Sequence, residues 1–121
     1  MGKTKSAVGR LTARELDRLI EEATVDCYGE DEQLTGLFTM IEQELALPFT
    51  TRILGVEASV IAVELDDSGI KAICGRGRQR QSIPLADLPL PSPAPSGADW
   101  IAAYRRWARH GFAPSEEQED E

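Results

Sequence analysis

The amino-acid sequence predicts an α+β fold, in which an N-terminal helix-loop-helix packs on a small antiparallel SH3-like β-sheet or barrel and a C-terminal helix follows. Apolar residues first recur with helical spacing, short β-branched runs separated by turn residues come next, and aromatic residues then return to helical spacing. The 121 residues allow one hydrophobic core. Residues 1–113 are therefore predicted to form a single domain.

The helical pair is predicted over residues 11–47, and its start is well marked. Thr12 and Glu15 have the spacing of a capping box, in which each side chain binds the backbone N–H of the other residue. An apolar face follows and ends near Val25. After a short loop a second amphipathic pattern runs up to Pro48, which ends it because proline lacks a backbone N–H.

Residues 50–88 are predicted to form the small sheet or barrel, because β-branched runs alternate there with turn residues. The run Asp66-Asp67-Ser68-Gly69 has the composition of a hairpin turn. The candidate strands are Thr50–Leu54, Ser59–Leu65, Gly69–Cys74 and Gln79–Leu85.

The C-terminal part is predicted to be a connector, a helix and a tail. Residues 89–97 are rich in proline and have polyproline character. In the predicted helix 98–111, an aromatic stripe at helical spacing is interpreted as core-facing, and three arginines are expected on the solvated face. Residues 114–121 are acidic and predicted to be disordered. The aromatic residues are Trp100, Tyr104 and Trp107, and the arginines are Arg105, Arg106 and Arg109.

The charge of the chain is concentrated in one block. Between Leu19 and Thr51 there are eight acidic residues and no lysine or arginine, and the net charge of the whole chain is −8. Such a negative field attracts cations and basic partners and repels nucleic-acid phosphates. The block therefore favours a cation or a basic protein as ligand and makes nucleic-acid binding a weak hypothesis.

The acids at the centre of this block have the chemistry of a calcium site. Calcium takes six to eight oxygen ligands in flexible geometry, and Asp26, Glu30, Asp31 and Glu32 lie on a short segment where Gly29 permits a sharp turn. The segment is not an EF-hand, because the glycine falls too early after Asp26. The alternative is that the last three acids simply open the second helix, where the helix dipole favours them by roughly 0.3–1 kcal/mol each.

Two further groups of charged residues can be interpreted either as binding sites or as ordinary structural features. Asp66 and Asp67 are candidates for a second cation site, although Asp-Asp-Ser-Gly is ordinary turn chemistry. Arg76, Arg78 and Arg80 alternate along the chain, so they could grip phosphate or RNA, or form a solvated hairpin edge that discourages aggregation.

The acidic segment also resembles a known family. The run Thr24-Val25-Asp26-Cys27-Tyr28-Gly29-Glu30-Asp31-Glu32-Gln33, with Gly36 and Leu47-Pro48-Phe49, resembles the signature of the CcbP-type calcium-binding protein family. Ile83-Pro84-Leu85-Ala86-Asp87-Leu88, Asp99-Trp100 and Trp107 follow in the order of that family, so the resemblance covers roughly residues 20–112. Two departures are Leu37-Phe38-Thr39-Met40, where the family is aromatic-rich, and Cys27, where it often has alanine. The resemblance implies an intracellular calcium buffer or sensor without EF-hands.

These observations lead to one functional hypothesis and one alternative. The hypothesis is calcium-ion binding through the acidic inter-helix loop, with Ca²⁺ as the cofactor and Asp26, Glu30, Asp31 and Glu32 as ligands. The alternative is a metal-independent interaction module that binds a basic protein through its acidic helical face.

Several other classes are disfavoured. With a single histidine, His110, and no nucleophile set among acid or base partners, we do not expect an enzyme. Cys27 and Cys74 form no CxxC pair, so we expect reduced thiols rather than a zinc site or a disulfide. The basic N-terminus has no apolar region after it, and no stretch approaches the roughly 20 apolar residues of a membrane span. We therefore expect a cytoplasmic protein.

Overall fold

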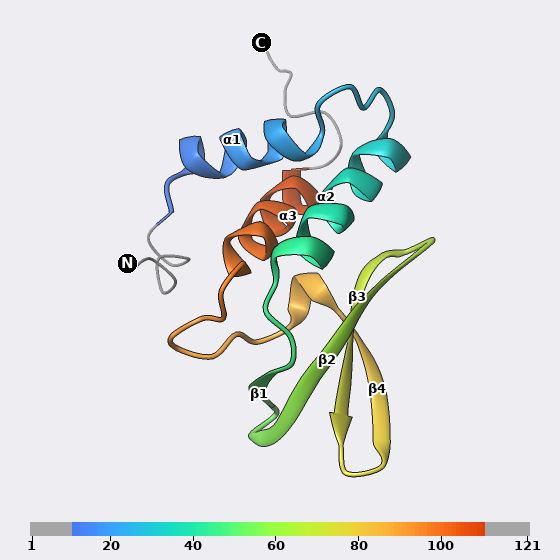
Figure 1. Ribbon diagram of the computed structural model, residues 1–121, viewed down its shortest axis with the longest axis vertical. Coiled ribbons are helices and arrows are strands. Elements are labelled where there is room, and N and C mark those ends of the chain that lie inside the picture. The colour runs from blue at the N-terminus through green and yellow to red at the C-terminus, as the bar shows by residue number, and fades with distance from the viewer. Residues whose placement is uncertain (1–10, 111–121) are drawn as a thin grey trace.

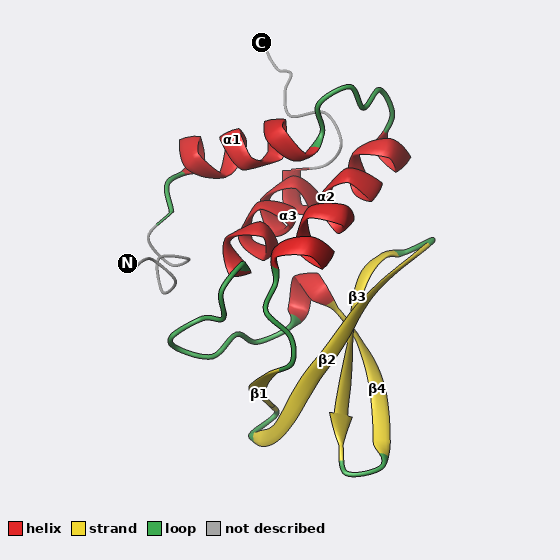
Figure 2. Cartoon of the chain, in the orientation of Figure 1, coloured by secondary structure: helices red, strands yellow, loops and turns green. Residues whose placement is uncertain are grey.

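A computed structural model describes residues 11–110 of the chain and confirms the α+β class (Figures 1 and 2). Two helices come first, a four-stranded antiparallel sheet follows, and a third helix ends the described part. The elements are α1 (Ala13–Ala23), α2 (Glu30–Glu44), β1 (Phe49–Ile53), β2 (Val56–Asp66), β3 (Gly69–Arg76), β4 (Gln79–Pro84), the short 3-10 helix η2 (Leu85–Asp87) and α3 (Ala98–His110).

The start of α1 is the predicted capping box. The Thr12 hydroxyl accepts a hydrogen bond from the Glu15 backbone N–H at 3.1 Å, and the Glu15 carboxylate accepts one from the Thr12 N–H at 2.9 Å. Two of the free N–H groups at this helix end are thereby satisfied. The helix ends at Ala23, two residues before the predicted end at Val25.

The four strands form an open meander in the order β1-β2-β3-β4. Asp66 pairs with Gly69 across a two-residue turn, so the predicted hairpin turn is present. Gly69 has a φ of +124°, a backbone conformation that favours glycine. Within residues 11–110, β1 and β4 do not pair with each other, so an SH3-like barrel is not confirmed and the sheet keeps two edge strands.

The core lies between the three helices and the part of the sheet that they cover. α1 contacts α2 and α3, α2 contacts β2, and η2 contacts both α3 and β3. Trp100, Tyr104 and Trp107 are all buried, which confirms the core-facing interpretation of the aromatic stripe. The turns of the β1–β2 and β3–β4 hairpins extend away from the helices (Figure 1).

The arginines of α3 differ from the expectation of a solvated face. Arg105 is half-buried and donates hydrogen bonds to the carbonyls of Leu85 and Leu88, and its burial lowers the pKa of its guanidinium. Arg106 pairs with Asp17 of α1 at 2.7 Å. These arginines therefore join α3 to η2 and α1, and only Arg109 remains exposed as expected.

Parts of the predicted architecture fall on residues that the structure does not describe. These are the first ten residues, the expected helix end at Gly111 and the acidic tail 114–121. Between residues 11 and 110, no helix is both long enough and apolar enough to cross a membrane.

Candidate functional site

The loop between α1 and α2 carries the predicted calcium ligands. The chain leaves α1 at Thr24, whose N–H still donates to the Ile20 carbonyl at 2.9 Å, and Cys27 N–H then donates to the Thr24 carbonyl at 2.9 Å. Between them Asp26 has a φ of +63°, a left-handed conformation that aspartate tolerates better than most residues. The reversal at Asp26 leaves its side chain exposed to solvent.

The remaining three acids form the first turn of α2. Gly29 is the N-cap and supplies no side-chain hydrogen bond. The Glu32 carboxylate instead accepts a hydrogen bond from the Tyr28 backbone N–H at 2.7 Å, which ties the end of the loop to the first turn of α2. Acidic groups here interact favourably with the positive end of the helix dipole. This arrangement is the one that the simpler alternative for Glu30, Asp31 and Glu32 predicts.

A shallow depression at the loop, which we call the acidic hollow, gathers part of the predicted ligand set. It is lined by Asp26, Cys27, Asp31, Glu32 and Thr35 and has a volume of about 340 Å³. Glu30 is not among its lining residues. Three of the four predicted acids thus border one hollow.

The fit of the hollow to a metal ion is partial. Its carboxylates are the hard oxygen ligands that calcium prefers. Among residues 11–110, however, no three His, Cys, Asp or Glu side chains lie close enough together to hold a metal. A calcium ion would need further oxygens from water or from backbone carbonyls, or a movement of the loop that brings the carboxylates closer together.

Sequence reasoning did not identify the apolar residues that flank Asp26. Val25 is 68% exposed and Tyr28 is 84% exposed. Both follow Ala23, the last apolar position of α1 that faces the core. The break in helical periodicity after Ala23 is therefore the sequence feature that could have indicated their exposure. The acidic loop therefore presents apolar as well as charged surface.

Two contacts hold the loop in place. A Cβ atom added at Gly36 would collide with the Ala23 carbonyl, so α2 approaches the end of α1 as closely as only glycine permits. The Trp107 indole N–H donates to the Gln33 side-chain oxygen at 2.9 Å and ties the first turns of α2 to α3. The position of the loop is thus set by helix packing.

The second candidate cation site at the β2–β3 turn is already occupied by protein groups. The Asp66 carboxylate accepts hydrogen bonds from Ser68 and from the Lys71 ammonium at 2.9 Å. These bonds, that from Lys71 first, lower the pKa of Asp66 to about 2. Neither Asp66 nor Asp67 lines the acidic hollow. The turn interpretation accounts for all the contacts of Asp66.

Comparisons of the chain with models of known protein families, with curated proteins and with solved structures found no match. The resemblance to the CcbP-type family rests on the sequence motifs quoted above.

Proposed function

We propose that the protein binds calcium at the acidic hollow and serves as a calcium buffer or sensor without an EF-hand. The observation that carries the proposal is that Asp26, Asp31 and Glu32 border one hollow although they come from the loop and from α2. The base-free block around them leaves their negative charge uncompensated in the sequence. A divalent cation would relieve the mutual repulsion of these carboxylates.

The donor set supports a weak site. Once a movement of the loop brings these side chains together, Asp26 and Asp31 would supply carboxylates, Glu32 would supply the lone pairs that the Tyr28 N–H leaves free, and water would complete the shell. Glu30 then contributes only long-range charge.

Thermal unfolding with added calcium or with chelator tests this proposal. A ligand that binds only the folded state stabilises it by about 2.7 kcal/mol at 100 times its dissociation constant, so millimolar calcium is expected to raise the melting temperature. Calorimetric titration gives the stoichiometry. If calcium produced neither a thermal shift nor heat, the proposal would be wrong.

Single substitutions then locate the site. Asp26→Asn and Asp31→Asn are expected to weaken calcium binding by about tenfold, on the scale of one lost charged ligand. The matched control removes an exposed acid elsewhere on α2, Glu42→Gln, and Asp66→Asn tests the alternative site at the β2–β3 turn. If Asp66→Asn weakened binding more than Asp26→Asn, the site would lie at the turn.

A second candidate function is favoured by the exposure of Val25 and Tyr28. Aromatic side chains such as that of Tyr28 are enriched at protein-binding sites relative to the rest of a protein surface. We infer a basic protein partner that covers these two residues and neutralises Asp26 and its neighbours. A basic peptide with aromatic residues is the probe, and its binding should weaken with salt, persist in chelator and fall in Tyr28→Ser.

Chelator therefore separates the two candidates. Binding of the basic peptide that requires calcium would contradict the metal-independent function. Binding that is unaffected by Tyr28→Ser would place the peptide elsewhere on the acidic surface.

A further inference from the structure

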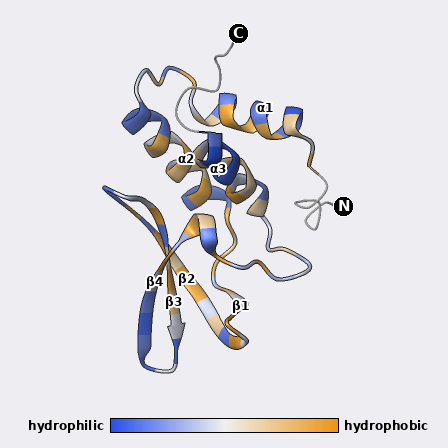
Figure 3. Cartoon of the chain, turned by 180° about the vertical axis from the view of Figure 1, so that it is seen from behind, coloured by the Kyte–Doolittle hydropathy of each residue, from blue (hydrophilic) through white to orange (hydrophobic). Residues whose placement is uncertain are grey.

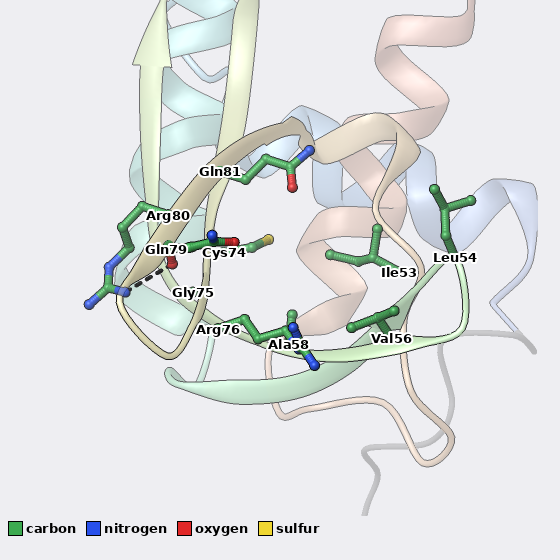
Figure 4. A pocket seen from close by; sticks show the side chains of 10 residues that line it. All are labelled: Ile53, Leu54, Val56, Ala58, Cys74, Gly75, Arg76, Gln79, Arg80 and Gln81. Atoms are coloured by element: carbon green, nitrogen blue, oxygen red, sulfur yellow. Dashed lines mark hydrogen bonds between the residues drawn. The ribbon is translucent and has the colours of Figure 1, made fainter.

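The turns of the β1–β2 and β3–β4 hairpins lie at the same end of the molecule, away from the helices (Figure 1). Leu54 of the first turn and Arg76 beside the second border one hollow on the sheet (Figure 4). We call residues 51–58 and 74–81, which contain the two turns, the hairpin end. The acidic loop between α1 and α2 lies at the opposite end of the longest axis (Figure 1).

An apolar side chain occupies the turn of the first hairpin. Ile53 pairs with Val56, so Leu54 and Gly55 form a two-residue turn. Leu54 is 98% exposed and Val56 is 43% exposed. In Figure 3 the end of this hairpin is coloured mainly as hydrophobic, whereas β4 is hydrophilic. The first hairpin therefore presents aliphatic surface to the solvent beyond its turn.

Leucine is an unusual residue for this turn. Leu54 has a φ of +52° and Gly55 a φ of +80°, and positive φ at both central residues is typical of a type I′ turn, where asparagine, aspartate and glycine are preferred. A bulky side chain is rarely found in this left-handed conformation. Its exposure to water gives no compensating burial. Neither the backbone nor the packing of the described chain favours leucine here, and such outliers often mark functional sites.

Three arginines surround the turn of the second hairpin. Arg78 lies in the turn itself, whereas Arg76 and Arg80 lie on opposite faces of the sheet, because Arg80 pairs with Gly75, the neighbour of Arg76. The Nη1 of Arg80 donates to the Gly77 carbonyl at 3.3 Å, which keeps this guanidinium near the turn. All three arginines are exposed, and none forms a salt bridge with a carboxylate of residues 11–110.

The hairpin end is positive although the chain as a whole is negative. Its two segments contain four arginines and one glutamate, in a chain of net charge −8. The glutamate, Glu57, pairs with Arg52 across β1 and β2, so these two charges offset each other. At physiological ionic strength, exposed charges more than about 8 Å apart are largely screened. A partner at the hairpin end therefore meets the arginines rather than the acidic loop.

This arrangement fits a flat partner. The arginines lie on both faces of one hairpin and Leu54 caps the other, so no single face of the sheet includes them all. A surface that approaches along the long axis contacts both turns at once (Figure 1). An anionic bilayer offers phosphates to the arginines and acyl chains to the aliphatic residues. Leucine and valine are, by contrast, under-represented among the residues that dominate protein–protein binding.

We propose that the hairpin end is a membrane-binding surface, which places Leu54 and Val56 in the headgroup layer of an anionic bilayer and pairs Arg76, Arg78 and Arg80 with lipid phosphates. The protein lies on the membrane and does not span it. The acidic loop then faces away from the bilayer (Figure 1). The surface shares no residue with the acidic hollow and requires no calcium.

Co-sedimentation with vesicles tests this proposal on the full chain. One set of vesicles is an equal mixture of phosphatidylcholine and phosphatidylglycerol, the other is phosphatidylcholine alone, and chelator is present throughout. The protein is expected to bind the mixed vesicles and to dissociate as the salt concentration rises. If it bound neither set at millimolar lipid, or both equally, the proposal would be wrong. Because chelator is present, such a failure leaves the calcium proposal unaffected.

Leu54→Asn tests the apolar contact without harming the turn. Asparagine is favoured in a type I′ turn, so the melting temperature should stay the same or rise. Vesicle binding is expected to weaken by about tenfold, because the leucine side chain is no longer buried in lipid. Val25→Asn removes an exposed apolar residue of the acidic loop and is the matched control, with unchanged binding. If Leu54→Asn bound as tightly as the unchanged protein, the proposal would fail.

A triple variant tests the charge contact. Basic residues near an anionic surface contribute roughly fivefold each to binding, so the loss of all three should weaken it by about a hundredfold. A control variant removes three exposed arginines from α1 and α3, with the same change in net charge and no expected effect. Equal losses in both variants would show that net charge alone governs binding and would overturn the proposal. The variants are Arg76→Gln, Arg78→Gln and Arg80→Gln, and in the control Arg14→Gln, Arg18→Gln and Arg109→Gln.

Two other outcomes would also overturn the proposal. Single-stranded RNA that binds more tightly than the vesicles, and whose binding survives Leu54→Asn but not the triple variant, would make the arginines a nucleic-acid contact. Concentration-dependent self-association that is lost in Leu54→Asn would identify a second copy of this chain as the partner of the hairpin end.

Discussion

The replacement Gly36→Ala tests whether the close approach of α1 and α2 positions the acidic loop. Gly36 lies inside α2, and an added Cβ would collide with the Ala23 carbonyl and lie 3.6 Å from the Cys27 sulfur. The first of these neighbours is backbone and cannot move by a side-chain rotation. The end of α1 would therefore have to shift away from α2.

Two opposing terms set the magnitude. Alanine favours a helix interior over glycine by about 1 kcal/mol. Overpacking in a close contact costs typically about 1–3 kcal/mol, and a backbone collision belongs at the upper end. We expect Gly36→Ala to lower the free energy of unfolding by about 2 kcal/mol. For a chain of this size that corresponds to a melting temperature on the order of 8 °C lower.

Thermal and denaturant unfolding measure this change, and Thr39→Ala is the matched control. Thr39 is exposed on the same helix, and its hydroxyl bonds back to the Thr35 carbonyl. That replacement is expected to stabilise the protein slightly, by at most about 0.5 kcal/mol, because alanine is the better helix former. If Gly36→Ala raised the melting temperature as Thr39→Ala does, the inferred helix contact would be refuted.

Two further predictions concern the sheet. Tyr104→Phe removes the hydroxyl that accepts a hydrogen bond from the buried Ile70 N–H at 3.2 Å, so about 1–3 kcal/mol of unfolding free energy should be lost; unchanged denaturant stability would contradict this. The pKa of Asp66, about 2 when folded, is below its ordinary value of 3.8, so its contribution to stability is present above about pH 4 and is lost as the pH falls through 2. In Lys71→Met an NMR titration should place this pKa closer to 3.8, and an unchanged midpoint would mean that Lys71 is not its main cause.

Local sequence determined the elements of this protein because their signals act between near neighbours. The capping box of Thr12 and Glu15, the end of α2 before Pro48 and the Asp66–Gly69 turn each depend on contacts within a few residues. The aromatic stripe of α3 also determined which face is buried, because helical periodicity places its members together.

Tertiary structure decided what the elements do together, because those outcomes depend on residues far apart in the chain. Whether the strands close into a barrel depends on the approach of β1 to β4, and in the described chain these two strands do not pair with each other. The roles of Arg105 and Arg106 depend on where α3 meets η2 and α1.

The acidic segment shows both what local sequence determined and what only tertiary structure decided. Its composition predicted a group of carboxylates, but helix packing decided that Asp26, Asp31 and Glu32 border one hollow while Glu30 does not. The left-handed turn at Asp26 and the Gly36 contact orient the loop, and a charge count carries no information about either. The sequence by itself therefore determined which chemistry is concentrated at the loop, and only the fold decided which oxygens share a space.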